Sequence, residues 1–334
     1  MTSSPRPPTL VDVARRAGVS TITASRALGN PQVVADATIE RVLAAVEATG
    51  YVPNLMAGGL KSRRSRLVAV LVPTIAVSQF LPTLEALTET LGAAGYQMII
   101  GQSGFDHSRE EALLDALVSR RPDGIVLIGR VHGERARARL RASHIPVVEA
   151  WELSEHPVNM VVGFSHLAVG RAVARYFLAK GMQRVGVATG DDSRGAIRLK
   201  GFVEAMGRDV PVAVVAAPGT MRRGRTALTE LLGKQPNLQA IYCSSDLLAL
   251  GVLAEAHARH LRVPEDLAIC GFGGTEFAAD TEPPLTTVQI DGAAIGTLAA
   301  QLILERCRGE AVRQQVIDVG FQIVERQSTR ATGA

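Results

Sequence analysis

Residues 9–28 contain two short helical patterns joined by a tight turn, and no other feature of the chain constrains its fold as closely. The first pattern repeats apolar side chains at the spacing of one helix face, at Leu10, Val13, Ala14 and Ala17. Gly18 suits the left-handed backbone position that ends a helix. Ser20 is placed to cap the second helix by accepting a backbone hydrogen bond. The pattern predicts a helix-turn-helix, whose second helix reads the major groove of duplex DNA.

We expect the second helix to bury Ala24, Ala27 and Leu28 and to turn its polar side chains outward. An arginine on that face can donate two hydrogen bonds to guanine or clamp a phosphate, and an exposed isoleucine suits a thymine methyl group. The DNA contacts predicted in this segment are Thr9, Ser20, Thr21, Ile22, Thr23, Ser25 and Arg26. The alternative is an ordinary helical hairpin whose arginine is solvated.

The excess positive charge lies in the same part of the chain. Residues 1–65 contain eight Arg and Lys against four Asp and Glu, whereas residues 66–334 contain 28 of each. The net charge of +4 therefore comes from the N-terminal segment. This distribution favours binding to phosphate groups through the release of counterions.

A third helix is predicted over residues 34–49, which would complete a headpiece of residues 1–50. Residues 51–65 follow as a hinge or linker, because Pro53 breaks the helix. A short helix over 55–60 is disfavoured by two glycines, each of which costs about 1 kcal/mol relative to alanine. We expect this hinge to form a helix only when DNA holds it in place. A plain flexible linker is the alternative.

From residue 66 onward, apolar strand patterns alternate with amphipathic helix patterns. Strands are predicted at 67–72, 98–100, 125–128, 147–148, 185–188, 240–243 and 267–270, and helices at 108–119, 168–180 and 246–258. Such alternation implies parallel sheets with right-handed crossovers. The fold class is thus a small all-α headpiece plus an α/β core of two doubly wound lobes. A ligand is expected between the lobes, at the carboxyl ends of the strands.

The predicted core spans residues 66–334. Its N-lobe is expected at about 66–160 plus 289–317, and its C-lobe at about 161–288 plus 318–330. The composition agrees with a parallel α/β core, since 47% of residues are hydrophobic and only 4% are aromatic.

Several sequence features limit the location and the chemistry of the protein. Cys243, Cys270 and Cys307 are odd in number and widely spaced, which favours free thiols in a reducing cytoplasm. The N-terminus lacks the apolar segment of a signal peptide, and no apolar run reaches the roughly 20 residues of a membrane span. We therefore expect a cytoplasmic protein without a membrane partner.

No pattern of catalytic residues is found. His257 and His260 have a spacing that can bind a metal, but no third ligand is evident, so a solvated helix end is favoured. The glycines at 271, 273 and 274 lack the third glycine of a dinucleotide site. We expect no enzyme activity, no metal and no cofactor.

Ten short segments along the chain form a familiar pattern: 12–14, 18–20, 50–54, the strand starting at 67, 197–202, 245–251, 263–266, 271–272, 284–288 and 325–329. With these segments the chain resembles, over nearly its whole length, the LacI/GalR family of bacterial transcription regulators. The family implies a DNA-binding headpiece, a hinge helix, a two-lobed core like that of periplasmic sugar-binding proteins, and a homodimer on a pseudo-palindromic operator. It also implies that Leu60 wedges into the minor groove, and Asn54, Ala57 and Lys61 complete the expected hinge contacts.

The resemblance also suggests a ligand site, with Arg198 as the main contact. The positions of Ser245 and Asp246 often hold Asn and Asp in the family. Sugar-binding members often carry an aspartate after the aromatic residue that corresponds to Phe272, and Gly273 stands there instead. The missing negative charge favours an anionic effector. The effector contacts predicted in this way are Arg194, Arg198, Ser245, Asp246, Phe272, Arg130 and Phe164.

Residues 130–132, 161–165, 192–201 and 318–321 look most like the gluconate-utilisation branch of the family. We therefore expect a sugar acid such as gluconate or a ketogluconate, whose carboxylate is bound by Arg194 and Arg198. Alternatives are a neutral sugar or a purine as effector, and an ion pair between Arg194 and Asp191, Asp192 or another acidic residue. We expect a repressor whose effector acts as inducer, and an effector that acts as co-repressor is the alternative.

Two other classes of protein fit the sequence less well. A periplasmic carrier would lack the headpiece and would carry a signal peptide, and a sugar-processing enzyme would need a nucleophile, a metal set or a phosphate loop. Within the regulator class, no heptad repeat follows residue 329, so a dimer is expected rather than a tetramer. Helices near 80–91 and 247–256 are the candidate dimer surfaces.

Overall fold

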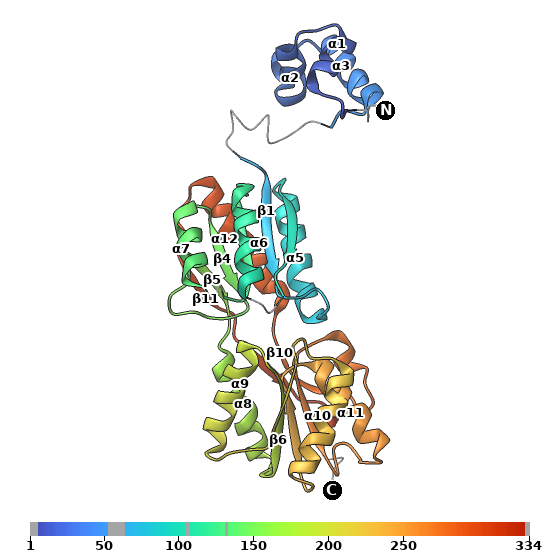
Figure 1. The fold of residues 1–334 in the computed structure, drawn as a ribbon, viewed down its shortest axis with the longest axis vertical. Coiled ribbons are helices and arrows are strands. Elements are labelled where there is room, and N and C mark those ends of the chain that lie inside the picture. The colour runs from blue at the N-terminus through green and yellow to red at the C-terminus, as the bar shows by residue number, and fades with distance from the viewer. Residues whose placement is uncertain (1–5, 53–63, 105–106, 131–132, 331–334) are drawn as a thin grey trace. The chain divides into compact units, whose positions relative to one another are not determined.

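The computed structural model describes residues 6–52, 64–104, 107–130 and 133–330. The chain divides into two compact units, residues 1–65 and residues 66–334. The first unit contains three α-helices among its described residues, and the second contains two sheets with their covering helices (Figure 1). No helix of the described residues is long and apolar enough to cross a membrane.

The headpiece forms the predicted helix-turn-helix from α1 (Leu10–Ala17) and α2 (Thr21–Gly29). Gly18 ends α1 with a φ of 66°, in the left-handed region that glycine adopts without strain. Ser20 caps α2, because its hydroxyl accepts a hydrogen bond from the Thr23 backbone nitrogen at 3.1 Å. Both local predictions are confirmed.

The third helix, α3 (Asp36–Thr49), begins two residues later than expected. A short 3-10 turn at Pro31–Val33 precedes it, and Val34 has an extended backbone, so neither Val34 nor Ala35 belongs to the helix. The three helices bury a small apolar core between them, made of Val13, Ala14, Ala17, Ala24, Ala27, Val42 and Ala45.

The first sheet of the core has the strand order β11-β5-β4-β3-β1-β2, and every neighbouring pair is parallel. Its strands are β1 (Leu67–Val72), β2 (Gln97–Gln102), β3 (Gly124–Ile128), β4 (Val147–Ala150), β5 (Met160–Gly163) and β11 (Val316–Asp318). Helices α5 (Leu81–Ala93), α6 (His107–Ser119), α7 (Glu134–Ser143) and α12 (Gly292–Arg308) surround it (Figure 1). The central strands are buried on both faces, as their continuous apolar sequences predict.

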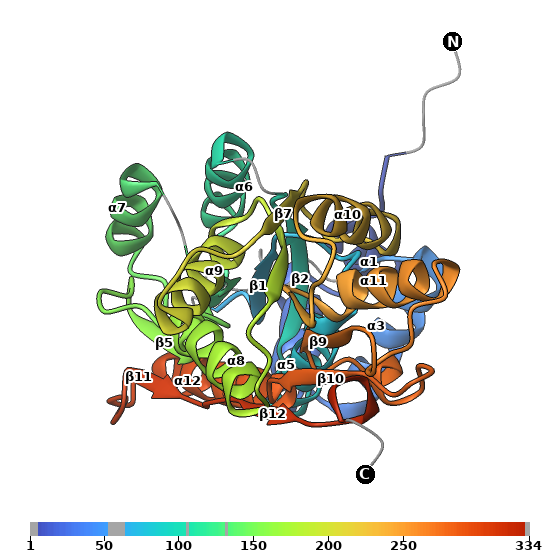
Figure 2. The same ribbon diagram turned by 90° about the horizontal axis from the view of Figure 1, so that it is seen from below.

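The second sheet has the order β12-β10-β9-β8-β6-β7, in which only β12 runs antiparallel to its neighbour. Its strands are β6 (Val185–Gly190), β7 (Val212–Val215), β8 (Ala240–Cys243), β9 (Ala268–Gly273), β10 (Thr286–Gln289) and β12 (Gln322–Val324). Helices α8 (His166–Ala179) and α9 (Ser193–Met206) lie on one side of this sheet, and α10 (Met221–Lys234) and α11 (Asp246–Ala258) lie on the other (Figure 2).

The boundary between the lobes differs from the expected one. Residues 161–163 were assigned to the C-lobe, but they continue β5, which pairs with β4 and β11 in the first sheet. The chain therefore crosses to the second lobe after Gly163, returns after β10, and crosses again after β11. The physical reason is strand pairing: Val148 lies opposite Met160, so the whole of β5 completes the first sheet.

Glycines allow α8 and α9 to pack with their backbones in contact. A Cβ atom on Gly170 of α8 would lie 2.0 Å from the Arg198 carbonyl oxygen, and one on Gly201 of α9 would lie 2.2 Å from the Leu167 carbonyl oxygen. The pair α10 and α11 uses the same device at Gly224 and Gly251. The α8–α9 contact brings the first residue of α8 beside the middle of α9.

Candidate functional site

A cavity lies between the two lobes of the core, at the carboxyl ends of their strands. The first lobe contributes Thr74, Val77, Gln79, Phe80 and Trp151, and the second contributes His166, Gly190, Asp192, Arg194, Arg198, Pro218, Gly219, Ser244, Ser245 and Phe272. About 560 Å³ of this space, its mouth included, is free of protein atoms.

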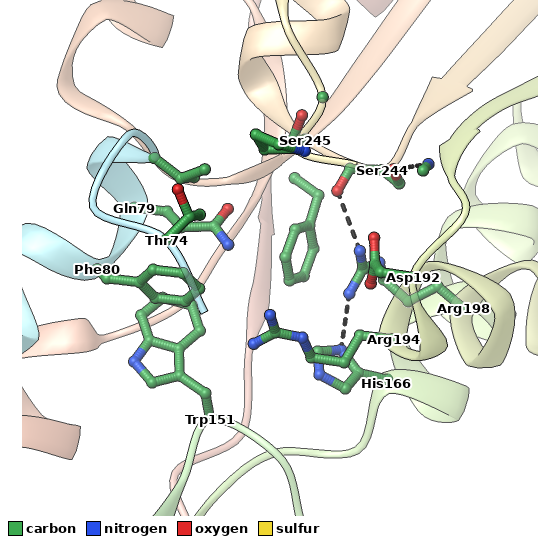
Figure 3. Close-up of a pocket in the computed structure, with 15 residues that line it drawn as sticks. Thr74, Gln79, Phe80, Trp151, His166, Asp192, Arg194, Arg198, Ser244 and Ser245 are labelled. Carbon is green, nitrogen blue, oxygen red and sulfur yellow. Dashed lines mark hydrogen bonds between the residues drawn. The ribbon is translucent and has the colours of Figure 1, made fainter. Parts of the chain in front are cut away.

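Figure 3 shows two unlike walls. Phe80 and Trp151 lie on one side, and Arg194, Arg198 and His166 lie on the other (Figure 3). The first wall offers apolar ring faces and the second offers nitrogen donors. Such a combination suits a ligand that has an apolar face and an acceptor-rich or anionic end.

Arg198 is the central cation of this site, and its side chain is held on three sides. Its Nη1 donates to His166 Nδ1 at 2.9 Å, and its Nη2 donates to the Ser244 carbonyl oxygen at 3.1 Å. The guanidinium carbon lies 4.1 Å from the centre of the Phe272 ring, in cation–π contact. Only 5% of the residue is exposed, and among the described residues no carboxylate lies within ion-pair distance of it. The buried Nε of Arg198 has no hydrogen-bond partner among the described residues.

His166 is the first residue of α8, whose N-terminus is capped by the Ser165 hydroxyl. Its Nδ1 accepts the hydrogen bond from Arg198, whereas its buried Nε2 has no partner among the described residues. Burial, followed by the positive charges of Arg198 and Arg194, holds the pKa of His166 well below its usual value of 6.5. The imidazole is therefore neutral at physiological pH.

Arg194 precedes Arg198 by one helical turn, and its guanidinium carbon lies 5.5 Å from the centre of the Phe80 ring. Burial lowers the pKa of Arg194, the charge of Asp192 opposes this shift, and that of Arg198 adds to it. Arg194 forms no ion pair with Asp191 or Asp192, which was the alternative expected from the sequence. Asp191 instead accepts from the Ala217 backbone, and Asp192 caps α9 through the Gly195 nitrogen.

The exposed face of α2 presents the side chains that were predicted to read DNA. Thr21, Ser25 and Arg26 are exposed, and Ile22 exposes 64% of its surface although it is apolar. Ser20 and Thr23 form the helix cap, and Thr9 bonds to Asp12 through both its backbone nitrogen and its hydroxyl. The four hinge residues Asn54, Ala57, Leu60 and Lys61 lie outside the described residues.

Comparison with known proteins matches both parts of the chain. Residues 9–54 match the family described as bacterial regulatory proteins, lacI family, and residues 174–329 match the periplasmic binding protein-like domain. The HTH-type transcriptional regulator GntR of Pseudomonas aeruginosa is 36% identical over 328 residues, 96% of each chain. The HTH-type transcriptional repressor CytR of Escherichia coli K12 is 31% identical over 97% of this chain and 96% of its own.

The chain belongs to the LacI family of bacterial regulatory proteins. A crystal structure of a LacI-family transcriptional regulator from Silicibacter pomeroyi agrees, with a TM-score of 0.91 and 33% identity over 97% of this chain and 100% of that one. The protein is thus a DNA-binding transcriptional regulator and not an enzyme. The lac repressor dimer, solved bound to its operator and the anti-inducer ONPF, shares this fold, with a TM-score of 0.82 and 23% identity over 98% of this chain and 100% of that one.

Three of the effector contacts predicted for this LacI-family regulator do not line the cavity. Asp246 is 1% exposed, and its carboxylate accepts hydrogen bonds from the Thr275 nitrogen and hydroxyl and from the Thr287 hydroxyl. Arg130 instead pairs with Glu152 at 3.2 Å. Phe164 lies behind the lining, with its ring edge-on to His166 at 4.7 Å between centroids.

Arg194, Arg198, Ser245 and Phe272 do line the cavity, although the Ser245 hydroxyl already caps α11 by accepting from the Leu248 nitrogen. Sequence reasoning missed Trp151, Phe80 and His166. A usable signal existed for two of them, because Trp151 directly follows β4, and His166 comes three residues after β5. Trp151 is held in a left-handed backbone with φ of 73°, and its indole nitrogen donates to the Thr83 hydroxyl at 2.9 Å.

Proposed function

We propose that this regulator is a repressor whose effector is a sugar acid of the gluconate type, bound between the lobes with its carboxylate on Arg198. The observation that carries the proposal is the buried guanidinium of Arg198, which has no carboxylate partner among the described residues. A buried charge without a counter-charge is unfavourable, and an anionic ligand relieves that cost.

The charges around Arg198 favour a single negative charge on the effector. Arg194 is attracted by Asp192 and Glu152, and Glu152 is itself paired with Arg130. His166 is neutral, so among the described residues around the cavity the positive charge of Arg198 is left without a balancing carboxylate. The Phe80 and Trp151 rings offer the carbon chain of a polyol an apolar wall. The relative named GntR agrees with the resemblance of residues 161–165 and 192–201 to the gluconate-utilisation branch.

Binding in the cavity is proposed to alter the angle between the lobes and so the operator affinity of the headpieces. In the headpiece, Thr21, Ile22, Ser25 and Arg26 are the proposed base-reading contacts, with Thr9, Ser20 and Thr23 beside them. The hinge contacts Asn54, Ala57, Leu60 and Lys61 stay part of this proposal. Since the operator is the partner, we also propose that the protein acts in the cytoplasm.

Thermal stability of the full chain with a ligand panel tests the effector class. The panel is gluconate, 2-ketogluconate, 6-phosphogluconate, glucose, cellobiose and adenosine. A ligand that binds only the native state at a hundredfold excess over its Kd adds about 2.7 kcal/mol of stability. We expect stabilisation by a sugar acid, loss of that effect in Arg198→Met, and retention in Arg175→Met, which alters an exposed arginine on α8. Stabilisation only by a neutral sugar or a nucleoside would discard the proposal.

The switch is tested by reciprocity. If the sugar acid weakens operator binding, operator DNA must weaken sugar-acid binding by the same factor, and couplings of this kind typically amount to 1–3 kcal/mol. An operator fragment is first selected from random duplex DNA with the purified protein. Equal sugar-acid affinity with and without that fragment would show that the cavity does not control the headpiece, and a tighter affinity would show a co-repressor.

A further inference from the structure

The hydrogen bond from Arg198 determines which ring nitrogen of His166 carries a hydrogen atom. All nitrogens of an arginine side chain are donors, so the His166 Nδ1 that receives the Arg198 hydrogen bond must be the acceptor nitrogen of the ring. A neutral imidazole carries its one hydrogen on the other nitrogen. The Nε2 of His166 is therefore an N–H donor, in a single tautomer.

That donor has no partner among the residues that the structure describes. The atom is buried, and no described residue accepts a hydrogen bond from it. The ring cannot turn freely, because Phe164 packs edge-on against it and Arg198 holds its other nitrogen. Buried donors in native proteins are nearly always satisfied, and His166 lines the cavity, which Figure 3 shows with Arg194 and Arg198 beside it (Figure 3).

We infer that His166 selects effectors that carry an oxygen atom on the carbon next to the carboxylate. The inference rests on the proposed function, in which Arg198 binds that carboxylate. Because Arg198 bonds directly to the imidazole, the free N–H lies one ring width from the guanidinium. In an acid bound there, the nearest further acceptor is the oxygen on the second carbon. The ligand class is therefore the 2-hydroxy and 2-keto sugar acids.

Calorimetric titration of the full chain with gluconate and with 2-deoxygluconate tests the inference. The two ligands have the same charge and differ by one hydroxyl group at the second carbon. A single hydrogen bond between a protein and a ligand corresponds to about a three- to tenfold change in affinity. We expect the wild-type protein to bind gluconate more tightly by that factor.

Two substitutions of His166 distinguish the roles of its two ring nitrogens. In His166→Asn, the amide oxygen can replace Nδ1 as the acceptor for Arg198, but nothing reaches the position of Nε2. In His166→Gln, the longer amide can reach the position of Nε2 and donate there. We expect the preference for gluconate over 2-deoxygluconate to vanish in the Asn variant and to persist in part in the Gln variant. A purely structural role of His166 would lower both affinities by the same factor.

The outcomes for the two proposals are distinct. If gluconate binds and the wild-type protein shows no preference over 2-deoxygluconate, the role of His166 is wrong and the sugar-acid effector stands. If the preference is equally strong in wild type and both variants, the oxygen is recognised elsewhere and the inference is also overturned. If neither sugar acid binds the wild-type protein while a neutral ligand from the panel does, both proposals fall.

Discussion

Among single residues, Arg198 sets the chemistry of the cavity, because its buried charge is held by a histidine, a carbonyl oxygen and an aromatic ring but by no described carboxylate. The arrangement also aligns the guanidinium, since the Phe272 ring face and two hydrogen bonds leave it little freedom. The remaining N–H groups can therefore meet a ligand carboxylate without first being ordered.

The buried carboxylate of Asp246 joins the start of α11 to the segments that carry Thr275 and Thr287. Its two oxygens accept three hydrogen bonds from Thr275 and Thr287. We expect Asp246→Ala to lower the free energy of unfolding by about 2–4 kcal/mol, because buried donors lose their acceptor. Asp246→Asn should cost about 1 kcal/mol, since its amide oxygen still serves Thr275 and the Thr287 hydroxyl can turn to accept. Urea unfolding measures both. An Asn variant of unchanged stability that no longer binds effector would instead make Asp246 a direct contact.

The neutral state of His166 gives stability a pH dependence. In the folded protein its pKa is lowered by burial and by Arg198 and Arg194, whereas in the unfolded chain it is about 6.5. Below that value the unfolded state binds the extra proton, so stability is lost as the pH falls. One such histidine contributes about 1.4 kcal/mol between pH 7.5 and 5.5. We expect His166→Gln to lose that much of the pH dependence in urea unfolding, and an unchanged dependence would show that the folded His166 is protonated.

Some of these residues were accessible to sequence reasoning and others were not. Arg198 and Phe272 lie in segments whose pattern resembles the family, so their place in the cavity could be expected. Trp151 directly follows β4 and His166 comes three residues after β5, but their meeting in one cavity depends on how distant strands pair. Strand β5 was not predicted from the sequence, and neither residue was assigned to the site.

At the scale of secondary-structure elements, the contact between α8 and α9 places His166 beside Arg198. The two helices approach so closely that Gly170 has no room for a side chain. We expect Gly170→Ala to lower the free energy of unfolding by about 1–3 kcal/mol and to abolish effector binding, because α9 must shift with Arg198 on it.

Gly251→Ala is the matched control for that change. Its added Cβ would also lie 2.0 Å from a carbonyl oxygen, that of Met221, but on helices that carry neither His166 nor Arg198. We expect a similar loss of stability with effector affinity retained, measured calorimetrically at a temperature where both variants are folded. Equal losses of affinity in both variants would mean that the site responds to general destabilisation of the lobe.

The cap of α2 supports the DNA-reading surface. Ser20→Ala removes the hydroxyl that accepts from the Thr23 nitrogen, and we expect it to destabilise the headpiece by about 1 kcal/mol. Ser20→Asp keeps a capping oxygen and adds a negative charge. It should preserve headpiece stability, followed by circular dichroism, and weaken operator binding through repulsion of phosphates. Unchanged operator affinity in Ser20→Asp would place Ser20 away from the DNA backbone.

Every strand predicted from the sequence occurs in the structure, but the set was incomplete. All seven apolar runs form strands, whereas the five strands that were missed, β5, β7, β10, β11 and β12, are short. Strands β11 and β12 lie at sheet edges and are partly exposed, whereas β7 (Val212–Val215), also at an edge, is an apolar run that was overlooked. Their pairing depends on distant segments, as between β11 and β5, and local patterns carry no information about that.

At the scale of the whole molecule, a cavity in one compact unit is proposed to control a DNA-reading surface in another. The chain crosses between the lobes three times, and every strand pairs within its own lobe. A change in the angle between the lobes would therefore leave both sheets intact. The walls of the cavity come from both lobes, so we propose that an effector bound there changes their separation. Under the proposed function, binding and the position of the lobes are coupled.

The central claim, an anionic effector held by Arg198, is tested most directly by fluorescence. Trp151 is the only tryptophan of the chain and lines the cavity, so its emission responds to an occupant. Titration with gluconate should change the emission of the wild-type protein with saturation, titration with glucose should not, and Arg198→Met should abolish the response to gluconate. A saturating response to glucose in the wild-type protein, or a response to gluconate that persists in Arg198→Met, would contradict the account.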